Sequence, residues 1–480
     1  MAPHKYLAGA LLAIVTAGCA LQPPYRRPDA PIAATFPTGP AYGANAGNPA
    51  LPAAAAIGWR DFLPDQRLQR LVELALQNNR DLRVAALNVE RVRAQYRIQR
   101  AALFPQVGAS ASAAGGGTIG GAPRSAGNNF SVGLAASWEV DFFGRLRSLS
   151  DAAFQQYLAS RQARQAAQIL LVSQVADQYL TVLAFDEELA VTRQTLEAAQ
   201  ASYKIVKLEF DTGVASELDL RQSQGSVDVV TANHAAQQRL RAQAENALVL
   251  LVGQPLPADL PEPVRLDAQP ILADVPAGLP SDLLARRPDI QQAEAALRSE
   301  TANIGAARAA FFPRISLTGS LGTASSALGG LFSGGAWTVV PSLLMPIFTA
   351  GANRANLDVA VLERDIGIAQ YQKAIQTAFR EVADGLAARG TYVDQLAALQ
   401  RNANDQQRRL ELASLAYSNG VDSYLDVLTA RTDLYNAQLS LVSARLGQLT
   451  SLVDLYRALG GGWIEHTGDP SRLAARPDAG

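Results

Sequence analysis

Residues 130–142 alternate strictly between apolar positions and small or polar positions. The apolar set begins at Phe130 and ends at Phe142, with Trp138 between them. A period of two over thirteen residues predicts a β-strand with one apolar face and one polar face. A membrane barrel shows such an apolar face to lipid, whereas a soluble sheet buries it in a core. Phe130, Trp138 and Phe142 are therefore candidates for anchoring at the membrane interface, with core packing as the alternative.

The second half of the chain contains the same kind of pattern. Ile315, Leu317 and Leu321 alternate with hydroxyl residues, and apolar positions recur at every second residue from Trp337 to Ile347. Pro341 weakens this last strand, because proline removes a ladder donor. Trp337 is a fourth candidate for the membrane interface. Each half thus predicts two strands joined by a Gly/Ser-rich hairpin loop, which makes four strands per chain.

Apolar residues also recur seven positions apart along four other segments. Sustained heptads indicate long helices with coiled-coil packing. One helix is expected from about Leu146 to Thr212, and at 1.5 Å per residue it would be roughly 100 Å long. The heptad residues are Leu82, Val89, Tyr96 and Leu103; Ile290, Leu297, Ile304 and Phe311; Leu189, Leu196, Tyr203 and Phe210; and Leu396, Ala403, Leu410 and Tyr417.

The chain is an internal duplication. The motif DTGVASELDL at 211–220 reappears as SNGVDSYLDV at 418–427, an offset of 207, and the Phe-Pro helix ends at 104–105 and 312–313 differ by 208. Each copy has the order helix, strand, strand, long helix, helix. Repeat 1 is placed at 61–253 and repeat 2 at 281–460. A Pro-rich linker, 254–280, separates them, and the tail 461–480 is expected to fray.

The N-terminus reads as an export signal followed by a lipid anchor. Residues 1–18 combine a basic start, a short apolar stretch and small residues, which predicts a signal peptide. Cys19, the only cysteine of the chain, stands where a bacterial lipobox places its lipidated residue. The alternative is a plain secretory signal with a chance cysteine. A Pro-rich segment, 19–60, follows and is expected to be extended. No transmembrane helix is expected in the mature chain.

Composition narrows the function. The chain carries 42 basic and 43 acidic residues, three histidines and one cysteine. This balance gives no reason to expect nucleic acid as a partner, and the histidines and cysteine are too few for a structural zinc site. We found no P-loop, nucleophile elbow or metalloprotease motif. We therefore expect neither an enzyme nor a metal, and no cofactor apart from the covalent lipid.

Four strands cannot close a membrane barrel, because an open sheet edge is not stable in lipid. Two chains would give eight strands, and an eight-stranded barrel is filled by its own side chains. Three chains would give twelve, which is the smaller plausible duct. The alternative from another class is a structural coiled-coil lipoprotein tethered to the outer membrane, which would not need these strands.

The stretch from Trp59 to Val107 resembles the opening of the outer-membrane factors, in particular the NodT-type lipoprotein branch of the TolC-like exit ducts. WEVDFFGR at 138–145, the two Gly-Val turns and LDVL at 425–428 fit the same family. The resemblance implies a homotrimer in which a twelve-stranded outer-membrane barrel continues into a long periplasmic α-helical barrel. It also implies a periplasmic adaptor and an RND-type inner-membrane pump as partners. The implied function is passive exit of small molecules, with a duct for type I protein secretion as the alternative.

Candidate site residues lie at the ends of the two long helices. Gly213 and Gly420 follow these helices, where glycine can take the left-handed conformation. Each is followed by an S-x-x-D capping box, Ser216 to Asp219 and Ser423 to Asp426. The aspartates either cap helices or, in a threefold assembly, contribute rings of carboxylates to a gate.

By resemblance, Leu425 matches a gate leucine of the family. The gate candidates are Leu218, Asp219, Asp422, Leu425 and Asp426. The resemblance also suggests that the turns contact the adaptor, through Gly213, Val214, Gly420 and Val421. Tyr203 and Tyr417 occupy heptad positions, so packing is their expected role and a hydrogen bond at the gate is the alternative.

Overall fold

The computed structural model describes residues 21–42, 52–115 and 128–469. The predicted signal peptide, 1–18, and the predicted lipidation site Cys19 therefore lie outside the described residues. The chain forms two compact units, and each draws on both repeats. One unit comprises residues 1–30, 87–162 and 291–374, and the other comprises 31–86, 163–290 and 375–480. The repeats are thus units of sequence and topology, while the compact units are built from parts of both.

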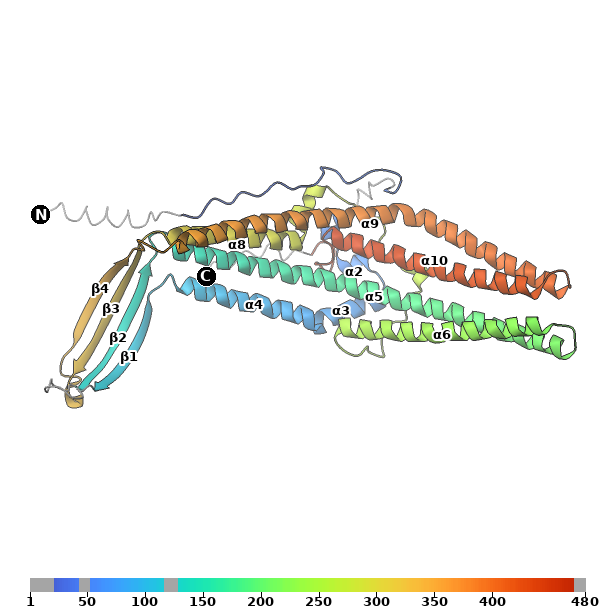
Figure 1. Cartoon of the computed structure of the whole chain (residues 1–480), viewed down its shortest axis with the longest axis horizontal. Helices are drawn as coiled ribbons and strands as arrows, with labels where there is room; N and C mark the ends of the chain where they lie inside the picture. The colour runs from blue at the N-terminus through green and yellow to red at the C-terminus, as the bar shows by residue number, and fades with distance from the viewer. Residues whose placement is uncertain (1–20, 43–51, 116–127, 470–480) are drawn as a thin grey trace. The chain divides into compact units, whose positions relative to one another are not determined.

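Both repeats have the predicted order of a helix, two strands, a very long helix and a shorter helix (Figure 1). Short helices come before this duplicated order in each half of the chain: η1 (Ala54–Ala56), α2 (Trp59–Phe62) and α3 (Gln66–Asn78) in the first half, and η2 (Leu266–Ala268), η3 (Pro280–Asp282) and α7 (Leu283–Arg286) in the second. Repeat 1 contains α4 (Arg80–Ala101), β1 (Gln106–Gly115), β2 (Asn128–Val140), α5 (Arg145–Asp211) and α6 (Glu217–Val252). Repeat 2 contains α8 (Pro288–Ala309), β3 (Arg314–Ser325), η4 (Leu328–Gly330), β4 (Ala336–Leu344), α9 (Ala352–Ser418) and α10 (Tyr424–Ala458).

The two long helices confirm the heptad prediction. Helices α5 and α9 each contain 67 residues, and α5 begins and ends within one residue of the predicted limits. Among the described residues, α5 also contains an 18-residue window of mean hydropathy 1.2, apolar enough for a membrane span, but 61% of that window is buried inside the protein. That burial is typical of a helix packed against other helices.

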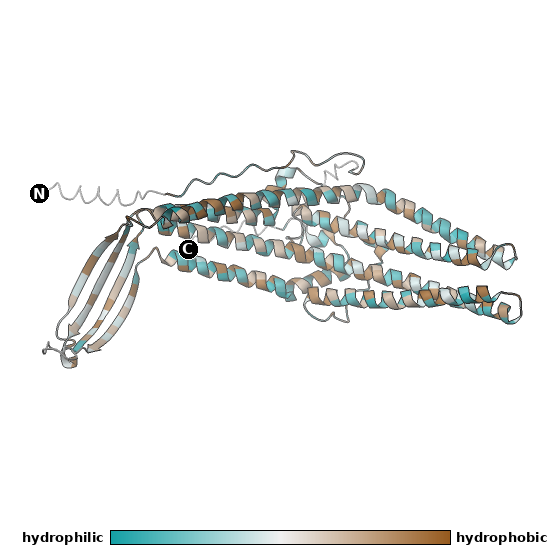
Figure 2. Cartoon of the chain, in the orientation of Figure 1, coloured by the Kyte–Doolittle hydropathy of each residue, from teal (hydrophilic) through white to brown (hydrophobic). Residues whose placement is uncertain are grey.

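The four strands form one antiparallel sheet in the order β1-β2-β3-β4. Hydroxyl pairs join neighbouring strands on one face: Ser112 with Ser131 at 2.7 Å, Ser316 with Ser342 at 2.6 Å, and Ser320 with Thr338 at 2.7 Å. The register places Val132, Leu134, Leu321 and Trp337 on the opposite face. The alternation of apolar and polar positions is visible along the strands in Figure 2. Pro341 lies in β4, an edge strand within this sheet, where a missing donor is tolerated.

The predicted extent of β2 was wrong at its C-terminal end. The strand ends at Val140, and Phe142 lies in the following turn. The carboxylate of Asp141 accepts hydrogen bonds from the backbone N–H groups of Leu146 and Arg147, at 3.0 and 2.8 Å. Asp141 thus satisfies free donors at the start of α5, which ends the strand. Phe142 packs against Phe143, at 5.3 Å between ring centroids.

The prediction that the tail frays was wrong for residues 461–469. The N–H of Trp59 donates to the carbonyl of Ile464, and Arg60 forms an ion pair with Glu465 at 2.8 Å. The N–H of Thr467 donates to Asp61. This part of the tail therefore pairs with α2, and residues 470–480 lie outside the described part of the chain.

The core of the second unit gathers around α2 and α3. The rings of Phe62 and Tyr456 stack at 3.9 Å, and the Tyr456 hydroxyl donates to the carbonyl of Ile57. Asp65 is buried, caps α3 and accepts a hydrogen bond from the Tyr179 hydroxyl at 2.9 Å. The linker joins the same core, since Gln269 donates to Asp65 and Leu266 is buried.

Candidate functional site

The two turns that connect the paired helices have the predicted backbone. Gly213 has φ +80° and Gly420 has φ +70°. The valines that follow them are among the most exposed apolar residues of the chain, with Val214 79% and Val421 75% accessible. Any partner that reaches the ends of these hairpins therefore meets an apolar side chain on each.

The two capping boxes differ. Ser216 accepts a hydrogen bond from the N–H of Asp219, and the Asp219 carboxylate accepts one from the N–H of Ser216, so the first box is complete. The prediction was wrong for the second box. The hydroxyl of Ser423 donates to the Asp426 carboxylate at 2.7 Å and makes no side-chain cap to the backbone. Asp426 is consequently free of the backbone role that occupies Asp219.

A hydrogen bond joins the two hairpins near their ends. The Tyr417 hydroxyl, from α9, donates to Oε2 of Glu209, from α5, at 2.7 Å. Burial, followed by the neighbouring Glu209 carboxylate, raises the pKa of Tyr417. The ring of Tyr417 packs on a buried cluster of Val206, Tyr424 and Val427. Tyr417 thus has the packing role that its heptad position predicts, and it also makes a hydrogen bond between the hairpins; a gate role for this bond stays a prediction.

A second polar contact lies beside the first. Arg431 of α10 donates through Nη2 to the Ser202 hydroxyl of α5 at 2.8 Å. Its Nε and Nη1 atoms, and the Tyr424 hydroxyl, are buried without a hydrogen-bond partner among the described residues. Unsatisfied buried donors cost free energy. This contact between the hairpins therefore contributes less stability than its burial suggests.

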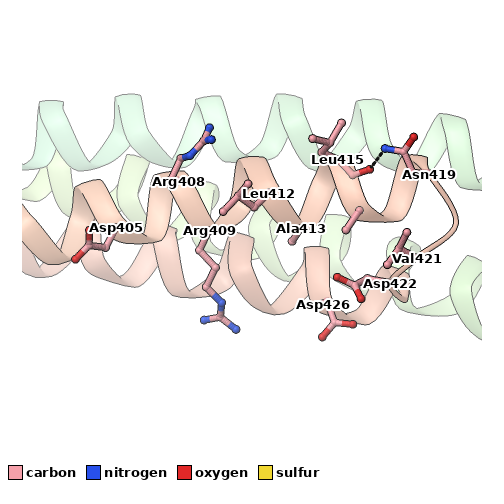
Figure 3. A pocket seen from close by; sticks show the side chains of 11 residues that line it. Asp405, Arg408, Arg409, Leu412, Ala413, Leu415, Asn419, Val421, Asp422 and Asp426 are labelled. Carbon is pink, nitrogen blue, oxygen red and sulfur yellow. Dashed lines mark hydrogen bonds between the residues drawn. The ribbon is translucent and has the colours of Figure 1, made fainter.

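An open groove of about 870 Å³ lies along α9 and the start of α10 (Figure 3). Leu412, Leu415 and Val421 contribute its apolar side chains, and Arg408 and Arg409 lie further along α9. Asp422 and Asp426 stand together at the turn end of the groove. The groove therefore offers an apolar centre between an acidic end and an end of mixed charge, where Asp405 lies near the two arginines.

The remaining gate candidates lie on the surface of the same two hairpins. Leu218 is 65% exposed near the start of α6 and Leu425 is 53% exposed near the start of α10. Asp219 lies in the first turn of α6, where it completes the first capping box. The structure therefore brings the candidates of both repeats to one end of the second unit.

Three of the four aromatic candidates lie on the strands, on the apolar face. Phe130 is near the start of β2, and Trp138 near its end donates through Nε1 to the carbonyl of Leu103 at 3.0 Å. Trp337 of β4 is 73% exposed. Exposed and half-buried aromatics on the apolar face suit a membrane interface. Phe142 lies in the turn that follows β2 and so does not share this strand face.

Sequence reasoning missed Glu209, Ser202 and Arg431. Their signal was available but weak: Glu209 is a charged residue beside a heptad position in the last turn of α5. Such residues are usually solvated, and only the packing of α5 on α9 and α10 identifies these three. No group of histidine, cysteine and acidic side chains suited to a metal occurs among the described residues.

A sheet with one lipid-compatible face joined to very long paired helices defines a class of outer-membrane channel proteins. The outer membrane efflux protein family matches residues 71–254 and 279–461, one stretch in each repeat. The chain belongs to this family. It is 47% identical over 477 residues to the toluene efflux pump outer membrane protein TtgC of Pseudomonas putida, covering 97% of each chain. It is 43% identical to outer membrane protein OprJ of Pseudomonas aeruginosa, covering 95% of each.

Among solved structures, the chain is similar to the open state of the MtrE outer membrane channel of Neisseria gonorrhoeae. The TM-score is 0.84 at 40% identity, over 94% of this chain and all of that one. The fold and the location predicted from the sequence are confirmed: this is an efflux protein of the outer membrane, mainly helical, with a small four-stranded sheet.

Proposed function

We propose that three copies of this chain form a passive exit duct. The observation that carries the proposal is the sheet: β1 and β4 each have one unpaired edge within the chain, and the sheet has one apolar face. An unpaired edge in lipid leaves backbone groups without partners, so each edge needs a strand from another copy. Three copies supply twelve strands, enough for an open lumen, with the hydroxyl-rich face inward.

The contacts between the hairpins act as a lock on the helical end of this duct. In each copy the bond from Tyr417 to Glu209 and the contact of Arg431 with Ser202 hold the α9–α10 hairpin against α5. Breaking them lets this hairpin move away from α5. Asp422 and Asp426, which lack the backbone role of Asp219, contribute carboxylates that favour cations at the entrance.

The partners follow from the family and from the surface of the hairpins. A periplasmic adaptor contacts the exposed turns at Gly213, Val214, Gly420 and Val421, and the apolar centre of the groove adds contact area. An RND-type pump in the inner membrane supplies the energy. Relatives are named for toluene and antibiotic efflux, which supports small organic molecules as cargo. Cys19 carries the lipid that anchors the chain in the outer membrane, with processing of residues 1–18 before it.

The first test is the native mass of the detergent-extracted protein. Three chains per particle are expected, and a stable monomer would contradict the duct. The second test is bilayer conductance of the Tyr417→Phe variant. Losing a hydrogen bond to a carboxylate removes about 1.5 kcal/mol from the closed state, so the leak should rise roughly tenfold.

The control is Tyr435→Phe, which removes a buried hydroxyl contact with Thr192 at 3.1 Å, between α10 and α5 and further from the turns. This variant should leave the leak unchanged. Equal leak conductance in the wild type and in Tyr417→Phe would show that Tyr417 does not help to hold the duct closed. Replacing Asp422 and Asp426 with asparagine should lower cation preference, and unchanged ion selectivity would leave these carboxylates without a role at the entrance.

A further inference from the structure

The Pro-rich segment after the signal peptide is seated on repeat 2. This segment, Leu21–Tyr42, is termed the strap, and it is the extended dark blue trace in Figure 1. Arg308, at the end of α8, donates to the carbonyl of Leu21 at 3.2 Å. A Cβ atom added at Gly305 would lie 2.9 Å from Cα of Gln22. Glycine at position 305 therefore lets the strap backbone lie directly on the helix.

A nearly buried carboxylate is the centre of this seat. Glu294 of α8 is 6% exposed. It accepts hydrogen bonds from Arg27 at 2.7 and 3.1 Å, from the Tyr25 hydroxyl at 3.2 Å, and from Arg298 at 2.8 Å. Burial would raise the pKa of Glu294, but hydrogen bonds from Arg27 and Arg298 outweigh it and lower the pKa. The carboxylate thus stays charged where the strap supplies one of its two counter-charges.

The aromatic ring of Tyr25 completes the contact. The guanidinium of Arg298 lies 4.5 Å from the centre of this ring. Burial and the charge of Glu294 raise the pKa of Tyr25 to about 12. A cation over an aromatic face is attracted to the ring, which strengthens such a contact.

Repeat 1 has no such seat. The positions that match Glu294, Arg298 and Gly305 in repeat 1 hold Ala86, Glu90 and Arg97. None of these three positions of α4 therefore holds the residue type that the matching position of α8 holds. The two repeats differ at these positions, so only α8 has the residues that hold the strap.

In the second unit the rest of the strap is held in a similar way. The rings of Phe36 and Phe379 stack at 5.4 Å, and Phe36 is buried. A Cβ atom added at Gly390 would collide with the carbonyl of Ala41. The positions that match Phe379 and Gly390 in repeat 1 hold Val172 and Leu183. Repeat 2 thus receives the strap in both units.

We propose that Glu294, Arg298 and Gly305 form a docking seat for the strap, and that this seat fixes the lipid anchor at the level of the membrane strands. The proposal rests on the lipidation of Cys19 proposed above. Leu21 is two residues from Cys19, a reach of about 7 Å at most along an extended chain. Arg308, which holds Leu21, is six residues before the first residue of β3. The seat therefore keeps the acylated residue beside the place where the chain enters the bilayer.

Trypsin tests the seat in the intact protein. The bond between Arg26 and Arg27 is a tryptic site, whereas the bond after Arg27 precedes a proline. Cleavage there releases an N-terminal peptide that carries any palmitate label on Cys19. We expect labelled, detergent-extracted wild type to keep its label, and Glu294→Ala to lose it at least tenfold faster. The charge exchange of Arg27→Glu with Glu294→Arg should restore most of the protection.

Glu90→Ala, an exposed glutamate on α4, is the matched control and should behave as the wild type. Glu294→Gln keeps the size of the side chain and should also lose protection if Glu294→Ala does not fold. Rapid cleavage of the wild type, or equal rates in the wild type and both Glu294 variants, would overturn the seat. A wild type that carries no label would overturn the lipidation alone. The seat would then be judged by mass, from the loss of residues up to Arg26.

Discussion

In each repeat, the residue that follows the last helix lies against the segment just before the first helix, α4 in repeat 1 and α8 in repeat 2. Gly253 and Gly460 follow α6 and α10 with φ of +79° and +86°. A Cβ at Gly253 would lie 2.5 Å from the carbonyl oxygen of Asn78, and one at Gly460 would lie 2.9 Å from that of Arg286. Both glycines are thus required twice, by the left-handed backbone and by the close approach.

The side chains that hold this junction differ between the repeats. In repeat 1, Asn79 donates to the carbonyl of Leu251 at 2.9 Å. In repeat 2, Arg287 occupies the matching position and donates to the carbonyl of Ala458 at 2.9 Å. Arg287 is 5% exposed and also binds Asp289 and Glu381. A backbone requirement has one solution, glycine, whereas a carbonyl can be capped by a neutral amide or by an arginine with its own counter-charges.

The largest loss of stability is expected at Gly253, where a left-handed backbone coincides with a close approach to another backbone segment. Gly253→Ala places a methyl group against the backbone of Asn78 and Asn79 in a left-handed conformation. We expect a loss of about 3 kcal/mol or more, enough to prevent trimer assembly. Gly213→Ala is the matched comparison, since Gly213 has φ +80° with open space around it. That variant should lose only about 1 kcal/mol.

The measurement is the yield of trimer in the outer membrane and its melting temperature by helical circular dichroism. Equal yields and melting temperatures for the two variants would show that the left-handed conformation alone matters, and that the contact between Gly253 and Asn78 is relaxed in solution.

The next effect separates the two ways of capping the carbonyl. Arg287→Met leaves the Ala458 carbonyl without this donor and removes a buried counter-charge from Glu381. Breaking such a pair costs about 3 kcal/mol. Asn79→Ala removes two hydrogen bonds, to the Leu251 carbonyl and from the N–H of Leu82, and should cost about 1–2 kcal/mol. Melting temperatures should rank Arg287→Met below Asn79→Ala; the reverse order would mean that Arg457, 3.6 Å from Glu381, replaces Arg287.

Patterns with a period could be predicted from the sequence. The heptads predicted the long helices because the same packing contact recurs every two turns. The alternation in 130–142 predicted β2 because successive side chains of a strand point to opposite faces. The limit of β2 could not be predicted, since Phe142 continues the alternation while Asp141 is taken by the N-terminus of α5. A periodic pattern does not show where another element takes over a residue.

Contacts between distant residues were beyond the sequence. The bond from Tyr417 to Glu209 joins residues 208 positions apart, and Glu294 receives Arg27 from 267 positions away. Proline-rich composition predicted that the strap is extended. It could not predict where the strap docks, because docking depends on residues of α8 such as Gly305, which lets the strap backbone come close. The tip residues Gly213 and Gly420 were predictable because their requirement is local.

A smaller effect, on the pH dependence of stability, compares the two repeats at the centre of their long helices. Asp177 of α5 and Asp384 of α9 occupy matching positions in the two repeats. Burial, followed by the negative charge of Asp454 and opposed by Arg457, raises the pKa of Asp177 to about 7. Its Oδ1 atom is buried without a hydrogen-bond partner among the described residues. Asp384 is 68% exposed and pairs with Arg380 at 3.7 Å.

A carboxyl whose folded-state pKa is raised binds its proton more tightly when the protein is folded. Between about pH 4 and pH 7 the folded state then holds more protons than the unfolded state, so stability falls as pH rises through this window and stays lower above it. We expect the free energy of unfolding of the wild type to be lower at pH 8 than at pH 5, by on the order of 2 kcal/mol from this group. The melting temperature should be lower at pH 8 for the same reason. Asp177→Asn should remove that part of the pH dependence and raise the melting temperature at pH 8. Asp384→Asn should change neither, because an exposed pair contributes little. A pH dependence that survives unchanged in Asp177→Asn would show that another titrating group carries it.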